Sequence, residues 1–295
     1  MSRTPEVEIL DGAMGTQLMA RGMQPGESPE RWNVDRPNDV LAIHQAYAQA
    51  GSQWVTTNTF GAHPMALARH GLEDRTEELV RAAVRVARAA GVQVLGDLGP
   101  FGDFLYPVGD ADPDEVREGF ARVVHAMLAE GVDGIVVETM ADPKEAALAV
   151  AAARAVNCNL PILATFSFQR RGGSFRTWTG ATVDDALTVV RESGVSAIGA
   201  NCGTDLSLDD YRQLAEELLR LACGTPVVMQ ANAGAPEVVL GSSPEYRVTP
   251  AEYGVFARDL IQLGVSWVGG CCGTSPAHIA AIGQTPPATI NPSIS

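Results

Sequence analysis

Short apolar runs recur along the chain with a spacing typical of alternating strands and helices. Each run is rich in Val, Ile, Leu or Ala and leads into small or polar residues, as buried parallel strands do. The runs occupy residues 7–15, 53–61, 92–100, 133–141, 161–169, 196–204, 226–234 and 265–274. The pattern predicts eight parallel strands with polar residues at their C-terminal ends.

Helical patterns fill the segments between these runs. Residues 74–91 place their apolar side chains on one helical face, with acidic residues early and arginines later. Residues 112–131 repeat this pattern, with Asp112 as a predicted N-cap and a terminal glycine as the stop signal. Residues 182–194 and 249–264 show the same helical pattern, each ending at a glycine.

Eight strands alternating with helices predict an α/β fold, a single (β/α)8 TIM barrel with its active site at the C-terminal ends of the strands. An open doubly wound sheet is the alternative, but no GxGxxG turn follows the first predicted strand. We assign residues 1–283 to the barrel. The Pro-rich tail, residues 284–295, is expected to be a linker or a disordered end.

Composition and charge narrow the functional classes. The chain has 295 residues, of which 46% are hydrophobic, and a formal net charge of −14. Such an acidic protein repels phosphate backbones and anionic headgroups, so we expect no nucleic-acid or membrane partner. No signal-peptide core or long apolar span is present, and the five cysteines do not indicate a secreted disulfide framework. The sequence therefore predicts a cytoplasmic protein with free thiols.

The cysteines at two predicted strand ends are the strongest chemical signal. Cys271 and Cys272 in "GGCCGT" could by themselves be small buried residues or a strained disulfide, and no CxxC pair is present. Cys202 in "GANCGT" ends the sixth predicted strand, whereas the pair ends the eighth. A barrel would bring these three thiolates together, and three thiolates form a zinc site with one open position. Cys158 and Cys223 precede other strands and are interpreted as structural.

Zinc held by three thiolates suits one kind of chemistry. The negative charge around the ion makes it a poor polariser of carbonyl groups. A free thiol with a pKa of about 8.5 is only slightly ionised at pH 7. Coordination to zinc removes its proton and leaves an electron-rich, nucleophilic sulfur. The predicted site therefore indicates alkylation of a substrate thiol.

The motifs at the strand ends resemble those of one enzyme family. "LDGAMGTQL", "TNTFG", "GDLGP", "VETMADPKEA", "GANCG", "NAGAP" and "GGCCGTSPAHI" together resemble the homocysteine S-methyltransferase family, over roughly residues 8–282. The stretch "GDLGPFGDFLYPVGD" is most similar to the homocysteine-binding barrel of cobalamin-dependent methionine synthase. The resemblance implies zinc on Cys202, Cys271 and Cys272, with Asn232 as a displaceable fourth ligand.

The resemblance also implies a homocysteine pocket. Asp11 and Gly12 match the residues that hold the charged end of the substrate, Thr59 matches the threonine of the second-strand motif, and Glu138 matches the acidic residue that meets the ammonium. A zwitterion requires carboxylates for its ammonium and N–H groups for its carboxylate. Structural roles are the alternatives: a turn at Asp11, an arginine partner for Glu138, and simple strand formation by Thr59.

The expected reaction is methionine biosynthesis, in which the ionised thiol of homocysteine attacks a donor methyl group. The cobalamin-dependent enzyme has folate, cobalamin and activation modules, for which this chain leaves no residues. We therefore expect methylcobalamin on a separate corrinoid protein, unless the chain is an excised piece. Betaine, S-methylmethionine and S-adenosylmethionine are alternative donors. Another small thiol as substrate, or a non-catalytic zinc-binding redox module, are the rival functions.

Two long segments near the predicted rim carry aromatic residues. They are residues 101–113 after the third strand and 169–180 after the fifth. Their aromatic side chains either pack the segments onto the rim or contact a ligand. The five histidines lack the spacing of metal ligands, and we expect them to have surface or packing roles.

Overall fold

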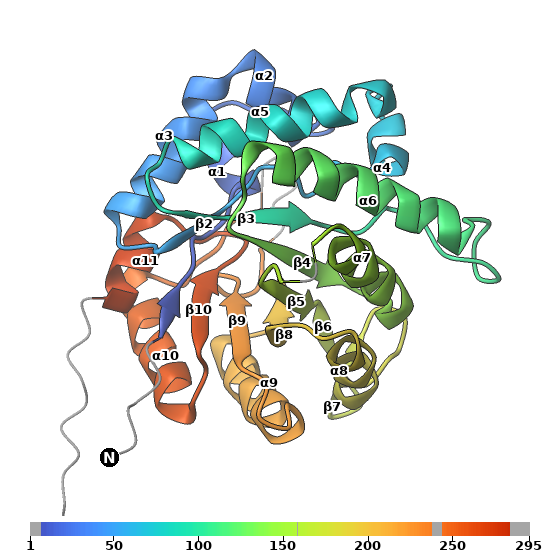
Figure 1. Cartoon of the computed structure of the whole chain (residues 1–295). Coiled ribbons are helices and arrows are strands. Elements are labelled where there is room, and N and C mark those ends of the chain that lie inside the picture. Colours follow the sequence, from blue (N-terminus) through green and yellow to red (C-terminus); the bar gives the residue numbers. More distant parts are fainter. Residues whose placement is uncertain (1–6, 158, 238–243, 284–295) are drawn as a thin grey trace, which may run out of the picture.

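The computed structural model describes residues 7–157, 159–237 and 244–283. These residues form one sheet of eight parallel strands, in the order β1-β10-β9-β8-β5-β4-β3-β2, surrounded by helices (Figure 1). The strands are β1 (Glu8–Ile9), β2 (Trp54–Thr56), β3 (Gln93–Leu98), β4 (Gly134–Met140), β5 (Ile162–Phe166), β8 (Ala197–Asn201), β9 (Val227–Ala231) and β10 (Trp267–Gly270). The predicted (β/α)8 barrel is confirmed, whereas Cys158 and the predicted tail lie outside the described residues.

The sheet comes close to closing between its first and last members. β1 and β2 do not form a regular ladder, but the Gln53 backbone N–H donates to the Ile9 carbonyl oxygen at 2.8 Å. The Ile9 N–H in turn donates to Gln53 Oε1 at 2.7 Å. These bonds join the two strands where the ladder is missing, so the sheet forms a nearly closed barrel.

Helices cover the outside of the barrel (Figure 1). They are α1 (Gly15–Ala20), α2 (Trp32–Asp35), α3 (Pro37–Gln49), α4 (Pro64–Ala68), α5 (Thr76–Arg88), α6 (Pro113–Glu130), α7 (Pro143–Val156), α8 (Val183–Glu192), α9 (Leu208–Leu221), α10 (Pro250–Leu263) and α11 (Pro276–Gly283), with 3-10 turns η1 (Pro29–Arg31) and η2 (Glu73–Arg75). The predicted caps of α6 are confirmed: Asp112 accepts from the Asp114 N–H, and Gly131 is left-handed with a φ of 84°. Within the described ranges, no helix has the length and apolar character needed to cross a bilayer.

The interior of the barrel is filled by one side chain from each strand or its immediate end. These side chains are Leu10, Trp54, Leu95, Val136, Leu163, Ala197, Val228 and Trp267. A larger apolar cluster lies between the sheet and the helices. Because side chains alternate along a strand, the residues two positions further on also face the interior, one layer nearer the C-terminal rim. That layer contains polar residues and forms the floor of the site described below.

The long segment after β5 contains structure that the sequence pattern did not predict. It forms a hairpin of β6 (Phe168–Arg171) and β7 (Ser174–Thr177). Phe175 is buried, as is Phe101 in the loop after β3. Phe104 and Trp178 stack with ring centroids 5.8 Å apart, so the two rim segments touch each other. Phe101, Phe104 and Phe175 thus pack the rim segments, while Tyr106 and Trp178 keep much of their surface exposed.

A fully buried histidine on α3 gives a testable dependence of stability on pH. Neither ring nitrogen of His44 has a hydrogen-bond partner among the described residues, and burial lowers the pKa of the imidazole from 6.5 to about 4. The unfolded chain therefore takes up a proton at a higher pH than the folded one. The neutral, buried imidazole therefore does not reduce the free energy of unfolding above pH 6.5. Below that pH the free energy of unfolding decreases as the pH drops toward 4.

We expect His44→Leu to remove this dependence. The free energy of unfolding of the variant minus that of the parent should increase by about 3 kcal/mol as the pH falls from 7 to 4. Urea denaturation at both pH values measures the gain, and His125→Gln, at an exposed helical position, is the control. A constant difference between parent and variant across this range would contradict the assignment.

Candidate active site

Three cysteine sulfurs meet at the C-terminal ends of β8 and β10. The Sγ atoms of Cys202, Cys271 and Cys272 all lie within 4.8 Å of one another, and those of Cys202 and Cys272 are 3.6 Å apart. Zinc–sulfur bonds of 2.3 Å in a tetrahedron place neighbouring sulfurs about 3.8 Å apart. The spacing of this cluster therefore suits a metal ion bound by three thiolates.

Local hydrogen bonds fix the backbone around these cysteines. Cys202 has a φ of 44°, a left-handed conformation that is uncommon for a residue with a side chain. Its carbonyl oxygen accepts from Ser167 Oγ at 2.8 Å. In the turn after β10, Thr274 Oγ1 donates to the Cys271 carbonyl oxygen at 2.8 Å and accepts from the Ala13 N–H at 3.1 Å. The sulfurs are thus held by turns anchored to several strands.

Proximity also changes the acidity of the thiols. Hydrogen bonds from Cys202 and Cys271 hold the pKa of the Cys272 thiol below its usual value, and the Tyr246 hydroxyl contributes in the same direction. Hydrogen bonding to Cys202 and Cys272, followed by burial, raises the pKa of the Cys271 thiol. One thiolate is therefore stabilised by its two neighbours, which gives the cluster a negative charge able to attract a cation.

Asn232 lies beside this cluster at the end of β9. Its Nδ2 donates to the Gly203 carbonyl oxygen at 3.1 Å, next to Cys202 in the sequence. The following residue, Ala233, donates its N–H to the Cys272 carbonyl oxygen at 2.9 Å. The Asn232 side chain is buried, and its Oδ1 has no hydrogen-bond partner within the described part of the chain. This oxygen is available to a ligand.

A small cavity joins the sulfur cluster to a group of carboxyl side chains. It has a volume of about 60 Å³ and is lined by Asp11, Gly12, Ala13, Met14, Thr56, Thr57, Asp97, Glu138, Gln230, Gly270 and Cys271. On this measure a single water needs only about 10–15 Å³, so the space can take a few small polar groups, such as the charged end of an amino acid. The cavity therefore offers one molecule contacts with Cys271 of the sulfur cluster and with several acidic residues.

Asp11 follows β1 and forms hydrogen bonds with Thr56 on β2, where the two strands lack a regular ladder. Its Oδ2 accepts from the Thr56 N–H at 2.8 Å, and its Oδ1 accepts from Thr56 Oγ1 at 3.0 Å. Burial raises the pKa of the carboxyl to about 7, although the hydrogen bonds from Thr56 oppose the shift. Both oxygens thus have a structural partner, while the side chain still lines the cavity.

Glu138 lies half-buried near the end of β4. Its Oε2 accepts from Asn201 Nδ2 at 3.2 Å. Burial raises the pKa of the carboxyl to about 8, with further contributions from the charges of Asp11 and Cys272. Among the described residues, Glu138 forms no ion pair with an arginine, so the alternative of a rim ion pair has no support.

Gly12 lines the cavity, but Thr59 does not. A Cβ atom on Gly12 would lie 2.5 Å from Thr274 Oγ1 and 2.9 Å from Tyr47 Oη, so only glycine fits there. Thr59 is buried; its Oγ1 donates to the Asp97 carbonyl oxygen at 2.8 Å and shares a hydrogen bond with Thr57 Oγ1. Thr59 thus forms a hydrogen bond with the backbone of β3 and does not contact the cavity.

Three polar residues of the site, Asp97, Asn201 and Gln230, were not singled out from the sequence. Asp97 follows the interior residue Leu95 by two positions, and Gln230 follows Val228 in the same way. Strand alternation could have placed both inside the barrel at its polar end. Asn201 immediately precedes Cys202 and is fully buried.

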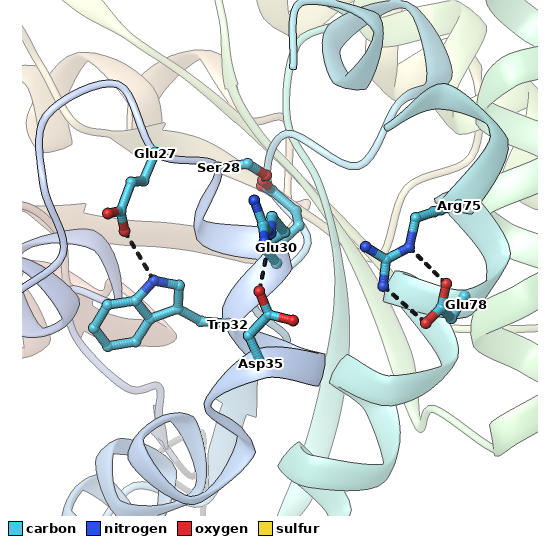
Figure 2. Close-up of polar contacts among 8 residues, drawn as sticks. Glu27, Ser28, Glu30, Trp32, Asp35, Arg75 and Glu78 are labelled. Atoms are coloured by element: carbon cyan, nitrogen blue, oxygen red, sulfur yellow. Dashed lines mark hydrogen bonds and ion pairs between the residues drawn. The ribbon is translucent and has the colours of Figure 1, made fainter. Parts of the chain in front are cut away.

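A second cavity, of about 450 Å³, lies beside Trp32 and is lined in part by Arg31 and Arg36. Figure 2 shows polar contacts of this region, among them the hydrogen bond that Trp32 Nε1 donates to Glu27 Oε2 at 3.2 Å and the ion pair that Asp35 forms with Arg31. Asp35 binds Arg31 at 2.9 Å, and Arg36 stacks on the Trp32 ring. Among the described residues, none that lines this second cavity has a buried side-chain oxygen without a hydrogen-bond partner, in contrast to Asp97 and Gln230 in the first cavity.

Comparisons with known proteins agree with these features. The family model described as homocysteine S-methyltransferase matches residues 8–285. The chain is 33% identical to methionine synthase of Mycobacterium tuberculosis over 94% of its own length and 24% of that protein. The methionine synthase of Mycobacterium leprae is 31% identical with the same coverage. The chain thus spans about a quarter of the length of these curated relatives.

Solved structures of a homocysteine methyltransferase match this chain over almost the whole barrel. The metallated form of the homocysteine methyltransferase MmuM from Escherichia coli matches with a TM-score of 0.75 and 25% identity. The match covers 94% of this chain and 95% of that one. The oxidized form of MmuM has a TM-score of 0.76. With the match of the family model, these findings show that the chain belongs to the homocysteine S-methyltransferase family.

Proposed function

We propose that this protein is a zinc-dependent homocysteine S-methyltransferase that forms methionine. The observation that carries the proposal is the cavity that connects Cys271 of the sulfur cluster with Asp11 and Glu138. Such a cavity can bind the thiol and the ammonium of one small amino acid. The similarity to MmuM, a homocysteine methyltransferase with a metallated form, supports both the substrate and the metal.

Cys202, Cys271 and Cys272 would hold the zinc, and the free Oδ1 of Asn232 would fill the fourth position until the substrate arrives. Zinc bound there supplies the Lewis acidity that keeps a substrate thiol ionised at neutral pH. No side chain is then required as a general base. The distances between the sulfurs support this ligand set.

The residues of the cavity bind and orient the substrate. Glu138 and Asp11 supply negative charge for the ammonium, and Gly12 lets the chain pass close to the bound molecule. Thr59 acts indirectly, by fixing the backbone of Asp97. With its amino-acid end held, the substrate sulfur is directed at the donor methyl group. A sulfur–carbon bond forms as the bond between the methyl group and the donor breaks.

We propose methylcobalamin on a corrinoid partner as the methyl donor. The identity to methionine synthases over almost the whole barrel supports it. A small donor such as S-methylmethionine, betaine or S-adenosylmethionine is the second candidate, because the homocysteine methyltransferase MmuM matches over 95% of its own length. A cytoplasmic location stays a prediction.

Incubation of the zinc-loaded protein with homocysteine and each donor in turn tests the proposal. We expect methionine to form with one donor and to disappear after chelation of the metal. The experiment measures methionine by mass spectrometry, with other small thiols as parallel substrates. Turnover of another thiol without methionine formation would refute homocysteine as the substrate. Turnover that survives complete removal of zinc would refute the role of the metal.

A further inference from the structure

We propose that Asp97 and Gln230 are specificity-determining residues that select a substrate carrying a free primary ammonium group. This inference rests on the proposed function and adds a second set of contacts to the same site. Asp97 lies in the GDLGP motif, but the resemblance described above assigned no role to Asp97 or to Gln230. The argument starts from two buried oxygen atoms that have no partner.

Asp97 is almost completely buried, with 4% of its surface exposed, and its Oδ1 has no hydrogen-bond partner among the described residues. The backbone around it is fixed on both sides. Its N–H donates to Thr57 Oγ1 at 3.0 Å, and its carbonyl oxygen accepts from Thr59 Oγ1 at 2.8 Å. Asp97 lines the cavity, and strand alternation from the interior residue Leu95 places its side chain on the interior face. It is therefore held in place without a partner of its own.

Gln230 supplies the second unpartnered oxygen. It is also 4% exposed, it lines the same cavity, and its Oε1 has no partner in the described part of the chain. Gln230 comes from β9 and Asp97 from β3, so the two side chains approach the cavity from different strands. Buried polar atoms are almost always hydrogen-bonded in folded proteins. Two such atoms in one cavity indicate a ligand that completes them.

The chemistry of these atoms defines the ligand. Gln230 Oε1 is an acceptor, and so is the Asp97 carboxyl in its ionised form. Burial raises the pKa of that carboxyl, and a cation bound beside it would favour the ionised form. A ligand that completes both oxygens therefore brings hydrogen-bond donors, and a positive charge suits Asp97. The nearby hydroxyl of Thr56 already donates to Asp11, whose two oxygens are both occupied. Asp97 thus differs from Asp11 in having a free oxygen for a ligand. A primary ammonium offers three N–H donors and a positive charge to this acidic cavity, which a neutral hydroxyl or amide does not.

The position of the cavity restricts the substrate further. Cys271 of the sulfur cluster lines it together with Asp97 and Gln230. A molecule that reaches both ends must carry a thiol and an ammonium a few bonds apart. We infer that the site takes small aminothiols with an unsubstituted amino group. It should reject thiols that lack this group or carry an acyl group on it.

Binding of homocysteine and of its analogue without the amino group, 4-mercaptobutyrate, tests this inference. Isothermal titration of the zinc-loaded protein should show at least about 30-fold tighter binding of homocysteine. Asp97→Asn should weaken homocysteine about 30-fold and leave 4-mercaptobutyrate within about 3-fold, because only the first ligand has an ammonium. Asp110→Asn, an exposed carboxyl on the loop after β3, is the matched control.

Gln230→Met provides a second variant of similar side-chain length, in case Asp97→Asn does not fold. It should weaken homocysteine about 5-fold without affecting the analogue. Equal affinity of the parent protein for both thiols, or unchanged discrimination in both variants, would overturn the inference. Selective binding that persists without methionine formation from any donor would refute only the proposed function. Unchanged discrimination in both variants, together with normal methionine formation by the parent, would refute only the role of Asp97 and Gln230.

Discussion

Replacement of Cys202 by alanine is expected to abolish zinc binding and methyl transfer together. The variant leaves Cys271 and Cys272 as two adjacent ligands and removes the sulfur that lies 3.6 Å from Cys272. Loss of groups that only support a metal ligand lowers metal affinity about 10- to 100-fold, and loss of a ligand itself should exceed this range. Metal analysis should show about one zinc per chain in the parent protein and almost none in the variant.

Cys223→Ala is the matched control, because Cys223 is an exposed cysteine outside the cluster. It should keep both the metal and the activity of the parent. Thermal unfolding of the variants shows whether the metal-free chain remains folded. Retention of stoichiometric zinc by Cys202→Ala would show that the three sulfurs do not act as one ligand set, and the proposed chemistry would then fail.

Replacement of Asn201 by alanine should have the second large effect, on stability as well as on the site. Asn201 is fully buried, and its Oδ1 accepts from the Thr139 N–H and from Thr165 Oγ1, each at 2.8 Å. Its Nδ2 donates to Thr139 Oγ1 at 2.7 Å and to Glu138 Oε2 at 3.2 Å. One side chain thus fixes the carboxyl of the candidate pocket and the end of β4.

The end of β4 depends on these bonds. Thr139 has a φ of 59°, which is unfavourable for a β-branched residue, and the register of β4 against β5 shifts between Val137 and Met140. Without Asn201, several buried groups lose their partners at a cost of about 1–3 kcal/mol each. We expect the free energy of unfolding to fall by about 4 kcal/mol in urea denaturation.

Two further variants separate stability from function. Asn159→Ala, at an exposed position, should leave the free energy of unfolding nearly unchanged. Asn201→Asp keeps the acceptors for Thr139 and Thr165 but replaces the donor to Glu138 with a second carboxyl group. It should retain more stability than the alanine variant and still bind homocysteine about 10-fold more weakly. Parent-like affinity in Asn201→Asp would refute the role of Asn201 in positioning Glu138.

The sequence alone determined the order and type of the main elements. Strand runs and helical faces are local periodic patterns, and the caps of α6 depend on residues within one turn of its ends, such as Asp112 and Gly131. The convergence of Cys202 with Cys271 and Cys272 also followed from the sequence, because a parallel barrel places the C-terminal ends of all its strands on one rim, and only β9 separates β8 from β10. The predicted limit of the barrel at residue 283 stays a prediction.

Only the tertiary structure decided which polar side chains have partners. Asp11 uses both oxygens on Thr56, whereas Asp97 keeps one free, although both are single acidic residues near strand ends. The sequence also gave no sign that Asn201 bonds to the end of β4, or that Phe104 stacks on Trp178. These contacts join residues far apart in the chain, and their geometry depends on strand register and on loop packing. Local propensity and periodicity contain no information about such pairs, so folding of the whole barrel settles them.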